Sequence, residues 1–502
     1  MAEKYQKRKD PDISSLLSIF KKFHAIIFFT SLFIFFSAAM SLTAHAGSRE
    51  PYAALPGLID NRSQFSDGAH SIEELVRLAH SRGFKVLSIN DHDRIAIAYG
   101  IPPFRNILSY KKEFPSILTH GAREYLREID RVSKMYPDMI IIPGCETSAY
   151  YYWTGSYFND DLTAHDYDKR VIILNFNDPD DYHNIPNLHN KLSLKYTERF
   201  LPLALIFLSL LFIGLFLMTW KGLPRIAGLI LVAVSILMIA DYNPFRSSMF
   251  TQYDGDKGIA PYQELINYVN KREGFVFWNY PEQKSGVRKY GPIKVHTPPY
   301  PHVLEQSRDY TGFAAVYGAF TKATKPGREW DSVLNEYCRG ERERPSWGIS
   351  AADFHEDGRL GLKLGSFPTI FLVKGFSKKA VLEAMERGRM YCSRSDGESW
   401  LRLHCFTVSG GDGKPFYMGE TLVTKQPPLI RFEISHKTEK PVTVFLIRGG
   451  EIIHRIKEKT PIQAEYLDKD APEGRKTYYR IMDSSEHLVS NPIFVTYNKD
   501  SS

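Results

Sequence analysis

The side chains most able to do chemistry in this sequence are carboxylates and imidazoles that follow apolar runs of the chain. An Asp-His-Asp triplet follows one such run, a glutamate follows another, and an Asp-x-His pair follows a third. In chain order these residues are Asp91, His92, Asp93, Glu146, Asp353 and His355. Carboxylate oxygens mixed with imidazole nitrogens suit zinc, manganese or iron, and such a metal lowers the pKa of bound water toward neutrality. The pattern therefore indicates a hydrolytic metal site.

Short β-rich runs that alternate with helical stretches would position these groups. They span residues 58–60, 86–89, 139–143, 171–175, 275–278, 313–317 and 347–350. This alternation predicts an α/β barrel or a doubly wound sheet. Ser71 and Glu74 fit a capping box that begins the first helix between strands. Because the residues that follow the strands of an α/β barrel meet at one mouth, we expect the carboxylates and imidazoles to come together in space.

Segments in the same chain order resemble the motif set of the PHP (polymerase and histidinol phosphatase) phosphoesterases. They are 65–75 (FSDGAHSIEEL), 89–93 (INDHD), 143–146 (PGCE) and 352–355 (ADFH). The resemblance covers residues 51–395, with an apolar insertion. It implies a distorted seven-stranded (β/α) barrel that hydrolyses phosphate esters with the help of divalent metals.

The same resemblance implies three metal positions, which this chain retains unequally. One position keeps all of its ligands, a second keeps its carboxylates at best, and the last keeps a single glutamate, Glu146. The complete set is Asp67, His92 and His355, and the partial set is Asp60, Glu146 and Asp353. We therefore expect one or two ions of zinc, manganese or iron. The structural alternative is that Asp67 is a turn residue and that His92 and His355 only orient loops.

The departures from the family pattern place other residues where metal ligands are expected. The family's H-x-H is replaced by DNR ending at Arg62, and a guanidinium offers only donors, so Arg62 cannot bind a metal. A histidine before proline is replaced by NYP at 279–281, and Lys169 and Arg170 stand near the fourth strand where a further histidine is expected. Arg62 could clamp a substrate phosphate through its bidentate fork. It could instead pair with Glu146 in place of a lost metal.

Apolar segments at residues 25–44, 201–219 and 226–240 predict the membrane topology. The first follows a basic N-terminus, residues 1–24, and reaches the roughly 20 residues of a spanning helix, although an A-x-A pattern ending at Ala46 leaves a cleaved signal peptide open. The other two are apolar on every side and predict a transmembrane hairpin over residues 201–240. The basic connection at 220–225 places their loop in the cytoplasm. A buried helical pair is the alternative.

This topology predicts a multi-pass protein of the cell membrane, with both parts of the barrel, residues 51–198 and 241–395, outside the cytoplasm. Residues 400–502 alternate short strands with turns and predict an immunoglobulin-like β-sandwich on the same side. The formal charge of +7 is scattered or flanks apolar segments, so we do not expect nucleic acid as a partner. The four cysteines contain no C-x-x-C pair, which argues against a thiolate zinc site, but a disulfide between Cys392 and Cys405 stays open.

Two functions follow from these features. One is a membrane-anchored, metal-dependent phosphoesterase-like hydrolase that acts outside the cytoplasm on a phosphate ester, either soluble or lipid-linked. The other is a catalytically impaired barrel that serves as an envelope binding or scaffolding module, because metal ligands are missing at two of three positions. The hairpin would leave the barrel after the fourth strand, through a loop expected at the mouth, and this favours lipid-linked esters.

Overall fold

The computed structural model describes residues 52–189, 193–283, 285–319, 321–359, 362–397 and 399–499. The N-terminal segment 1–24 and the apolar segment 25–44 lie outside these residues, so the choice between anchor and signal peptide stays a prediction. From Tyr52 onward the chain forms one compact unit. The boundaries expected between barrel, hairpin and C-terminal region also stay predictions.

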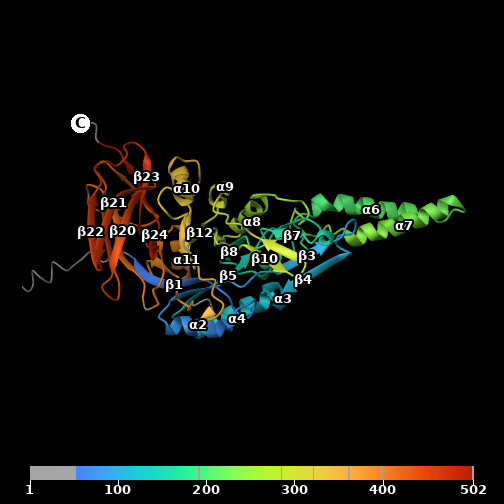
Figure 1. The fold of residues 1–502 in the computed structure, drawn as a ribbon, viewed down its shortest axis with the longest axis horizontal. Helices are drawn as coiled ribbons and strands as arrows, with labels where there is room; N and C mark the ends of the chain where they lie inside the picture. Colours follow the sequence, from blue (N-terminus) through green and yellow to red (C-terminus); the bar gives the residue numbers. More distant parts are fainter. Residues whose placement is uncertain are drawn as a thin grey trace, which may run out of the picture. The chain divides into compact units, whose positions relative to one another are not determined.

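All seven predicted strands occur, and they lie beside one another in chain order in a curled sheet (Figure 1). They are β1 (Ala53–Asn61), β2 (Val86–Ile89), β5 (Ile140–Thr147), β8 (Arg170–Leu174), β9 (Phe275–Asn279), β12 (Gly312–Val316) and β13 (Trp347–Ser350). The segment after β13 returns to β1, where Phe354 N donates to Asp60 O at 3.1 Å and Arg62 N donates to Phe354 O at 2.8 Å. These bonds join the two ends of the strand series at the level of Asp60, and we call this end of the sheet the mouth.

The fourth strand runs opposite to its neighbours. β8 pairs antiparallel with both β5 and β9, while β1, β2 and β5 are parallel to one another. Arg170, at the start of β8, therefore lies at the mouth, and Leu174 lies away from it. The expectation that the apolar insertion leaves through a loop at the mouth is thus wrong, because that loop follows the reversed strand.

Helices cover the sheet with apolar faces. The longer ones are α2 (Ile72–Ser81), α4 (Ala122–Met135), α8 (Ala260–Asn270), α10 (Glu329–Cys338) and α11 (Lys378–Glu386); the short ones are α3 (Ile117–His120), α5 (Pro179–His183), α9 (Val303–Gln306) and the 3-10 turn η1 (Tyr157–Asn159). The capping box is confirmed, since Ser71 Oγ accepts from Glu74 N and the Glu74 carboxylate accepts from Ser71 N. This reciprocal pair of bonds begins α2 at the position that the sequence indicates.

Two small sheets extend from the mouth. β3 (Ile95–Gly100) and β4 (Ser109–Phe114) form an antiparallel ribbon directly after β2 and the residues that follow it. The other sheet joins two excursions that follow β5 and β9: β6 (Tyr152–Thr154), β7 (Thr163–His165), β10 (Val287–Tyr290) and β11 (Ile293–His296). Neither sheet is among the strands expected from the sequence.

The apolar insertion forms a pair of long helices that lie side by side (Figure 1). They are α6 (Thr197–Leu217), with a mean hydropathy of 2.8, and α7 (Leu223–Asp241), with a mean hydropathy of 2.3. They meet closely at Gly214 and Gly228, where an added Cβ would overlap the facing helix. In the most apolar 18-residue window of each helix, only 17% of α6 and 11% of α7 is buried. A helix in the core of a soluble protein would be mostly buried. The two helices are long and apolar enough to cross a membrane, and spanning stays a prediction.

The C-terminal region continues the barrel sheet. β14 (Pro368–Val373) pairs with β1, β15 (Met390–Ser393) pairs with β14, and β24 (Leu488–Ser490) pairs with β15. The same sheet contains β18 (Thr421–Thr424), β20 (Pro441–Arg448), β21 (Glu451–Lys459), β23 (Lys476–Asp483) and β25 (Ile493–Tyr497). A separate sheet contains β16 (Arg402–Ser409), β17 (Pro415–Phe416), β19 (Leu429–Ser435) and β22 (Ile462–Leu467). The β-sandwich stays a prediction. No disulfide joins any two of the four cysteines, so the bond left open between Cys392 and Cys405 does not form.

Candidate functional site

The mouth is built from strand ends whose backbone turns sharply. Asp60, Tyr280 and Asp353, which follow or end three different strands, all have positive φ values, at 71°, 44° and 47°. Such left-handed conformations cost non-glycine residues on the order of 1–3 kcal/mol each and persist where the surrounding structure enforces them. Here the turns bring all three side chains into one polar network with Arg62.

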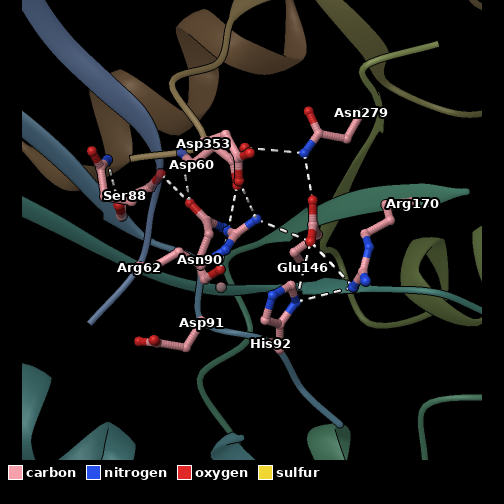
Figure 2. A network of polar contacts seen from close by, with 12 residues as sticks. Asp60, Arg62, Ser88, Asn90, Asp91, His92, Glu146, Arg170, Asn279 and Asp353 are labelled. Atoms are coloured by element: carbon pink, nitrogen blue, oxygen red, sulfur yellow. Dashed lines mark hydrogen bonds and ion pairs between the residues drawn. The ribbon is translucent and has the colours of Figure 1, made fainter. Parts of the chain in front are cut away.

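Arg62 occupies the centre of this network and has no exposed surface. Its guanidinium lies 2.5 Å from Asp60 Oδ1, 2.9 Å from Glu146 Oε2 and 3.4 Å from Asp353 Oδ1. It also donates to the backbone oxygen of Asn90. Figure 2 shows the guanidinium between these carboxylates. Of the two alternatives for Arg62, the ion pair with Glu146 is the one present. A direct contact of Arg62 with a substrate phosphate would require the side chain to leave its carboxylates.

The residues that replace the family's histidine after β9 complete this network. Asn279 Nδ2 donates to Asp60 Oδ2 at 3.0 Å and to Glu146 Oε1 at 2.7 Å, and the Tyr280 hydroxyl donates to Asp60 Oδ2. Asp60 and Glu146 are thus held by donors on both of their oxygens. The sequence identified these positions only as missing ligands, and no pattern in it indicated that they would bind the surviving carboxylates.

His92 joins the central network to the outer part of the mouth. Its Nδ1 lies 3.1 Å from Glu146 Oε2 and 3.1 Å from the Arg170 guanidinium (Figure 2). Its Nε2 lies 3.5 Å from Asp67 Oδ1. Arg170 lies here because β8 is reversed, and it also faces Glu146 at 3.4 Å. The sequence placed Arg170 near the fourth strand but could not place it in the site.

Asp67, His92 and His355 come together at the outer edge of the mouth, as expected for the complete ligand set. His355 Nε2 lies 3.1 Å from Asp67 Oδ2, and its Nδ1 lies 2.7 Å from the backbone oxygen of Asp353. A carbonyl oxygen can only accept, so Nδ1 carries the proton. Nε2 then contacts the Asp67 carboxylate favourably only if it too is protonated or if a cation lies between them. About half of the Asp67 side chain, 48%, is exposed.

The other acidic residues of the triplet at 91–93 serve the fold. Buried Asp91 accepts from Ser63 N at 2.8 Å and from the hydroxyls of Ser63 and Ser66, each at 2.6 Å. Buried Asp93 accepts from Asn187 Nδ2 at 2.7 Å, and its burial raises its pKa to about 6. Both carboxylates therefore hold loops around the mouth.

The charges at the mouth set the protonation of its carboxylates. Burial alone would raise the pKa of Glu146, but Arg62 and Arg170 outweigh it and hold that pKa well below its usual range. Burial would likewise raise the pKa of Asp67, but its contacts with His355 and His92 lower it. Burial opposes the charge on His355, whereas Asp67 and Asp353 raise its pKa above the usual value. The outer cluster therefore favours a positive charge on His355 or beside it.

The two expected metal positions differ in their fit to a metal. Among the described residues, no group of three or more His, Cys, Asp or Glu side chains is arranged as a ready metal site. At the centre, the Arg62 cation already neutralises the carboxylates, so the residues do not fit a metal. At the outer edge, two imidazoles present Nε2 to one carboxylate, which is a donor set that suits zinc, manganese or iron.

Comparisons with known proteins return solved structures only, since no family model and no curated protein matches the chain. One is a two-domain protein from Bacteroides vulgatus containing a predicted PHP-like metal-dependent phosphoesterase; it has 12% identity and a TM-score of 0.36, over 86% of this chain and 91% of that one. Another, from Bifidobacterium adolescentis, is described as a metal-dependent phosphoesterase, with 15% identity and a TM-score of 0.28, over 60% and 88%.

A further structure is an amidohydrolase from Chromobacterium violaceum with bound sulfate and no metal. It has 14% identity and a TM-score of 0.28, over 68% of this chain and 99% of that one. At these identities and TM-scores, the chemistry of the site rests on the residues of this chain.

Proposed function

We propose that this chain is a membrane-anchored, PHP-type phosphoesterase-like hydrolase that uses a single divalent metal ion at its outer cluster of Asp67, His92 and His355. The observation that supports this assignment most is the orientation of His355. Its Nδ1 donates to the Asp353 carbonyl at 2.7 Å, so Nε2, which faces Asp67 at 3.1 Å, is the ring nitrogen left to bind a metal. His92 Nδ1 lies 3.1 Å from both Glu146 Oε2 and the Arg170 guanidinium, so donation to Glu146 would leave Nε2 for a metal, whereas acceptance from Arg170 would not.

The roles at the site follow from these contacts. A zinc, manganese or iron ion bound at the outer cluster would supply a Lewis acid beside a phosphoryl group. Asp67, which is half exposed, stands where substrate arrives from solvent. Arg170, 16% exposed and near His92, is better placed than buried Arg62 to meet a negatively charged ester. Arg62 holds the carboxylates in place.

Metal content tests this proposal. Full-length protein purified without chelator should carry about one transition-metal ion per chain, and His92→Ala or His355→Ala should abolish both the metal and the hydrolysis of a generic phosphate ester. His80→Ala is a matched control, because this exposed imidazole pairs with Asp138 on the outer surface. Metal-free protein, with the site variants behaving like the control, would end the hydrolase assignment.

A second candidate is a binding or scaffolding module without turnover. The observation in its favour is the Arg62 guanidinium, which fills the space between Asp60, Glu146 and Asp353. A centre neutralised by an arginine needs no metal and offers no activated water. This candidate predicts folded protein without bound metal and without hydrolysis of any phosphate ester.

The membrane arrangement is part of the proposal. We propose that α6 and α7 span the bilayer, with the loop at 220–225 in the cytoplasm and the barrel and C-terminal strands on the other side. The length, mean hydropathy and exposed apolar surface of the two helices support this arrangement. The partners would then be the membrane and a phosphate ester, including a lipid-linked one, and nucleic acid is not expected.

A further inference from the structure

The tip of the β3–β4 ribbon exposes an apolar surface that nothing in the described chain covers. Residues 101–108 (IPPFRNIL) connect the two strands. Ile101 is 44% exposed, Ile107 41% and Leu108 52%. Single exposed apolar side chains are common on protein surfaces, but several on one short loop mark an interaction surface.

This tip is bonded to the end of α7. Asp241 Oδ1 accepts from Asn106 N at 2.7 Å and from Ile107 N at 3.2 Å, and the Asp241 backbone oxygen accepts from Asn106 Nδ2 at 2.6 Å. Figure 1 shows the ribbon reaching this end of the helix pair. The tip therefore stands at the level where α7 ends on the barrel side.

The ribbon is also fixed to the barrel side of the chain. The Tyr253 hydroxyl accepts from Gly100 N at 2.6 Å, and the Arg105 guanidinium lies 3.9 Å from the centre of the Tyr253 ring. Trp153 Nε1 donates to Ala98 O at 2.8 Å. Bonds along β3 and at the tip hold the ribbon in one position, so the apolar side chains of the tip have a fixed place on the surface.

We propose that residues 101–108 form a second membrane-contact element, which lies in the interfacial region of the bilayer that α6 and α7 span. This inference rests on the proposed spanning hairpin. If α7 leaves the bilayer at Asp241, a tip bonded to Asp241 must lie at the lipid boundary. Apolar side chains with Arg105 and exposed Lys112 nearby fit such a surface, where aliphatic groups enter the acyl boundary and basic groups stay among the headgroups.

Fluorescence quenching by lipids tests the inference. Full-length protein with Cys338→Ser and Cys405→Ser would receive an environment-sensitive dye at Ile107→Cys and be placed in vesicles containing spin-labelled lipids. Leu208→Cys, in the middle of α6, reports the span, and Lys457→Cys, exposed on β21, is the distant control. We expect several-fold stronger quenching at positions 107 and 208 than at 457.

The outcomes separate the two ideas. Strong quenching at 208 with quenching at 107 no greater than at 457 would overturn the contact element and leave the hairpin intact. No quenching at 208 would overturn the hairpin and the inference with it. A dye at 107 that is shielded from water but not quenched by lipid would indicate a protein partner or a second copy instead, and would also reject the proposal. Asp241→Ala removes the two hydrogen bonds that Asp241 Oδ1 accepts from the backbone of the tip. It should therefore weaken quenching at 107 but not at 208.

Discussion

Arg62 is a permanent charge at a site without exposed surface, and its stability there depends on the carboxylates that face it. Burial opposes the charge, but Asp60 and Glu146 keep the pKa of the guanidinium well above its usual value. Removing one partner of a buried ion pair is costly, because the charges left behind lose their compensation. The same physics makes the arginine a structural substitute for a metal ion in this position.

Arg62→Ala should therefore destabilise the protein by roughly 3–5 kcal/mol, because Asp60 and Glu146 would be buried without a cation. Urea unfolding of the detergent-solubilised protein, followed by fluorescence, measures the loss. Adding Glu146→Gln should recover part of it, since one uncompensated charge is removed. Arg131→Ala is the control, because Arg131 pairs with Glu128 and Glu73 at the exposed surface. Equal losses for Arg62→Ala and Arg131→Ala would contradict the structural role.

The sequence identified some members of the site better than others. Asp67, His92 and His355 come together as expected, because each lies in a motif next to a strand end. The carboxylate set also converges, but around a guanidinium. The roles of Arg170 and Asn279 could not be predicted, because they depend on strand direction and on a left-handed turn that leave no recognisable pattern in the residues.

At the scale of elements, the alternation of apolar runs predicted every strand of the barrel series but not their directions. A buried strand has the same composition whichever way it runs, so the sequence could not predict that β8 is antiparallel to its neighbours. The capping box of α2 could be predicted from the sequence because it depends on two polar side chains at a fixed spacing. β4 was missed because this exposed, partly charged strand lacks a clear alternation of polar and apolar residues.

The orientation of α6 and α7 can be measured by cysteine labelling. In a background with Cys338→Ser and Cys405→Ser, Lys221→Cys should react with an impermeant reagent only in inverted vesicles, if the basic loop faces the cytoplasm as proposed. Asp254→Cys and Lys499→Cys should react in intact cells. All three positions are exposed, so access rather than burial decides the result. Reaction of Lys499→Cys only from the cytoplasmic side would reverse the proposed localisation and reopen nucleic acid as a partner.

At the scale of the whole molecule, the membrane and the mouth are connected through hydrogen bonds rather than through a loop at the mouth. The chain leaves β8 at the far end, but Asn187 returns to bond Asp93, next to His92. Directly after Asp93, the six residues of β3 lead to the ribbon tip, which is bonded to Asp241. A strand of that length rises roughly 20 Å, so, if α6 and α7 span a bilayer that ends at Asp241, the outer cluster would stand about that far from the lipid boundary.

This distance bears on the substrate. A phosphate at the lipid headgroup level would not reach Asp67, whereas a phosphate ester on a long lipid-linked envelope intermediate would. We therefore expect purified full-length protein in vesicles to hydrolyse such lipid-linked esters faster than soluble nucleotides. Deleting residues 200–241 should remove that preference, because the mouth would no longer be held at the membrane. Equal or faster turnover of soluble esters, unchanged by the deletion, would mean that α6 and α7 serve only as an anchor and that the approach of substrate does not depend on the bilayer.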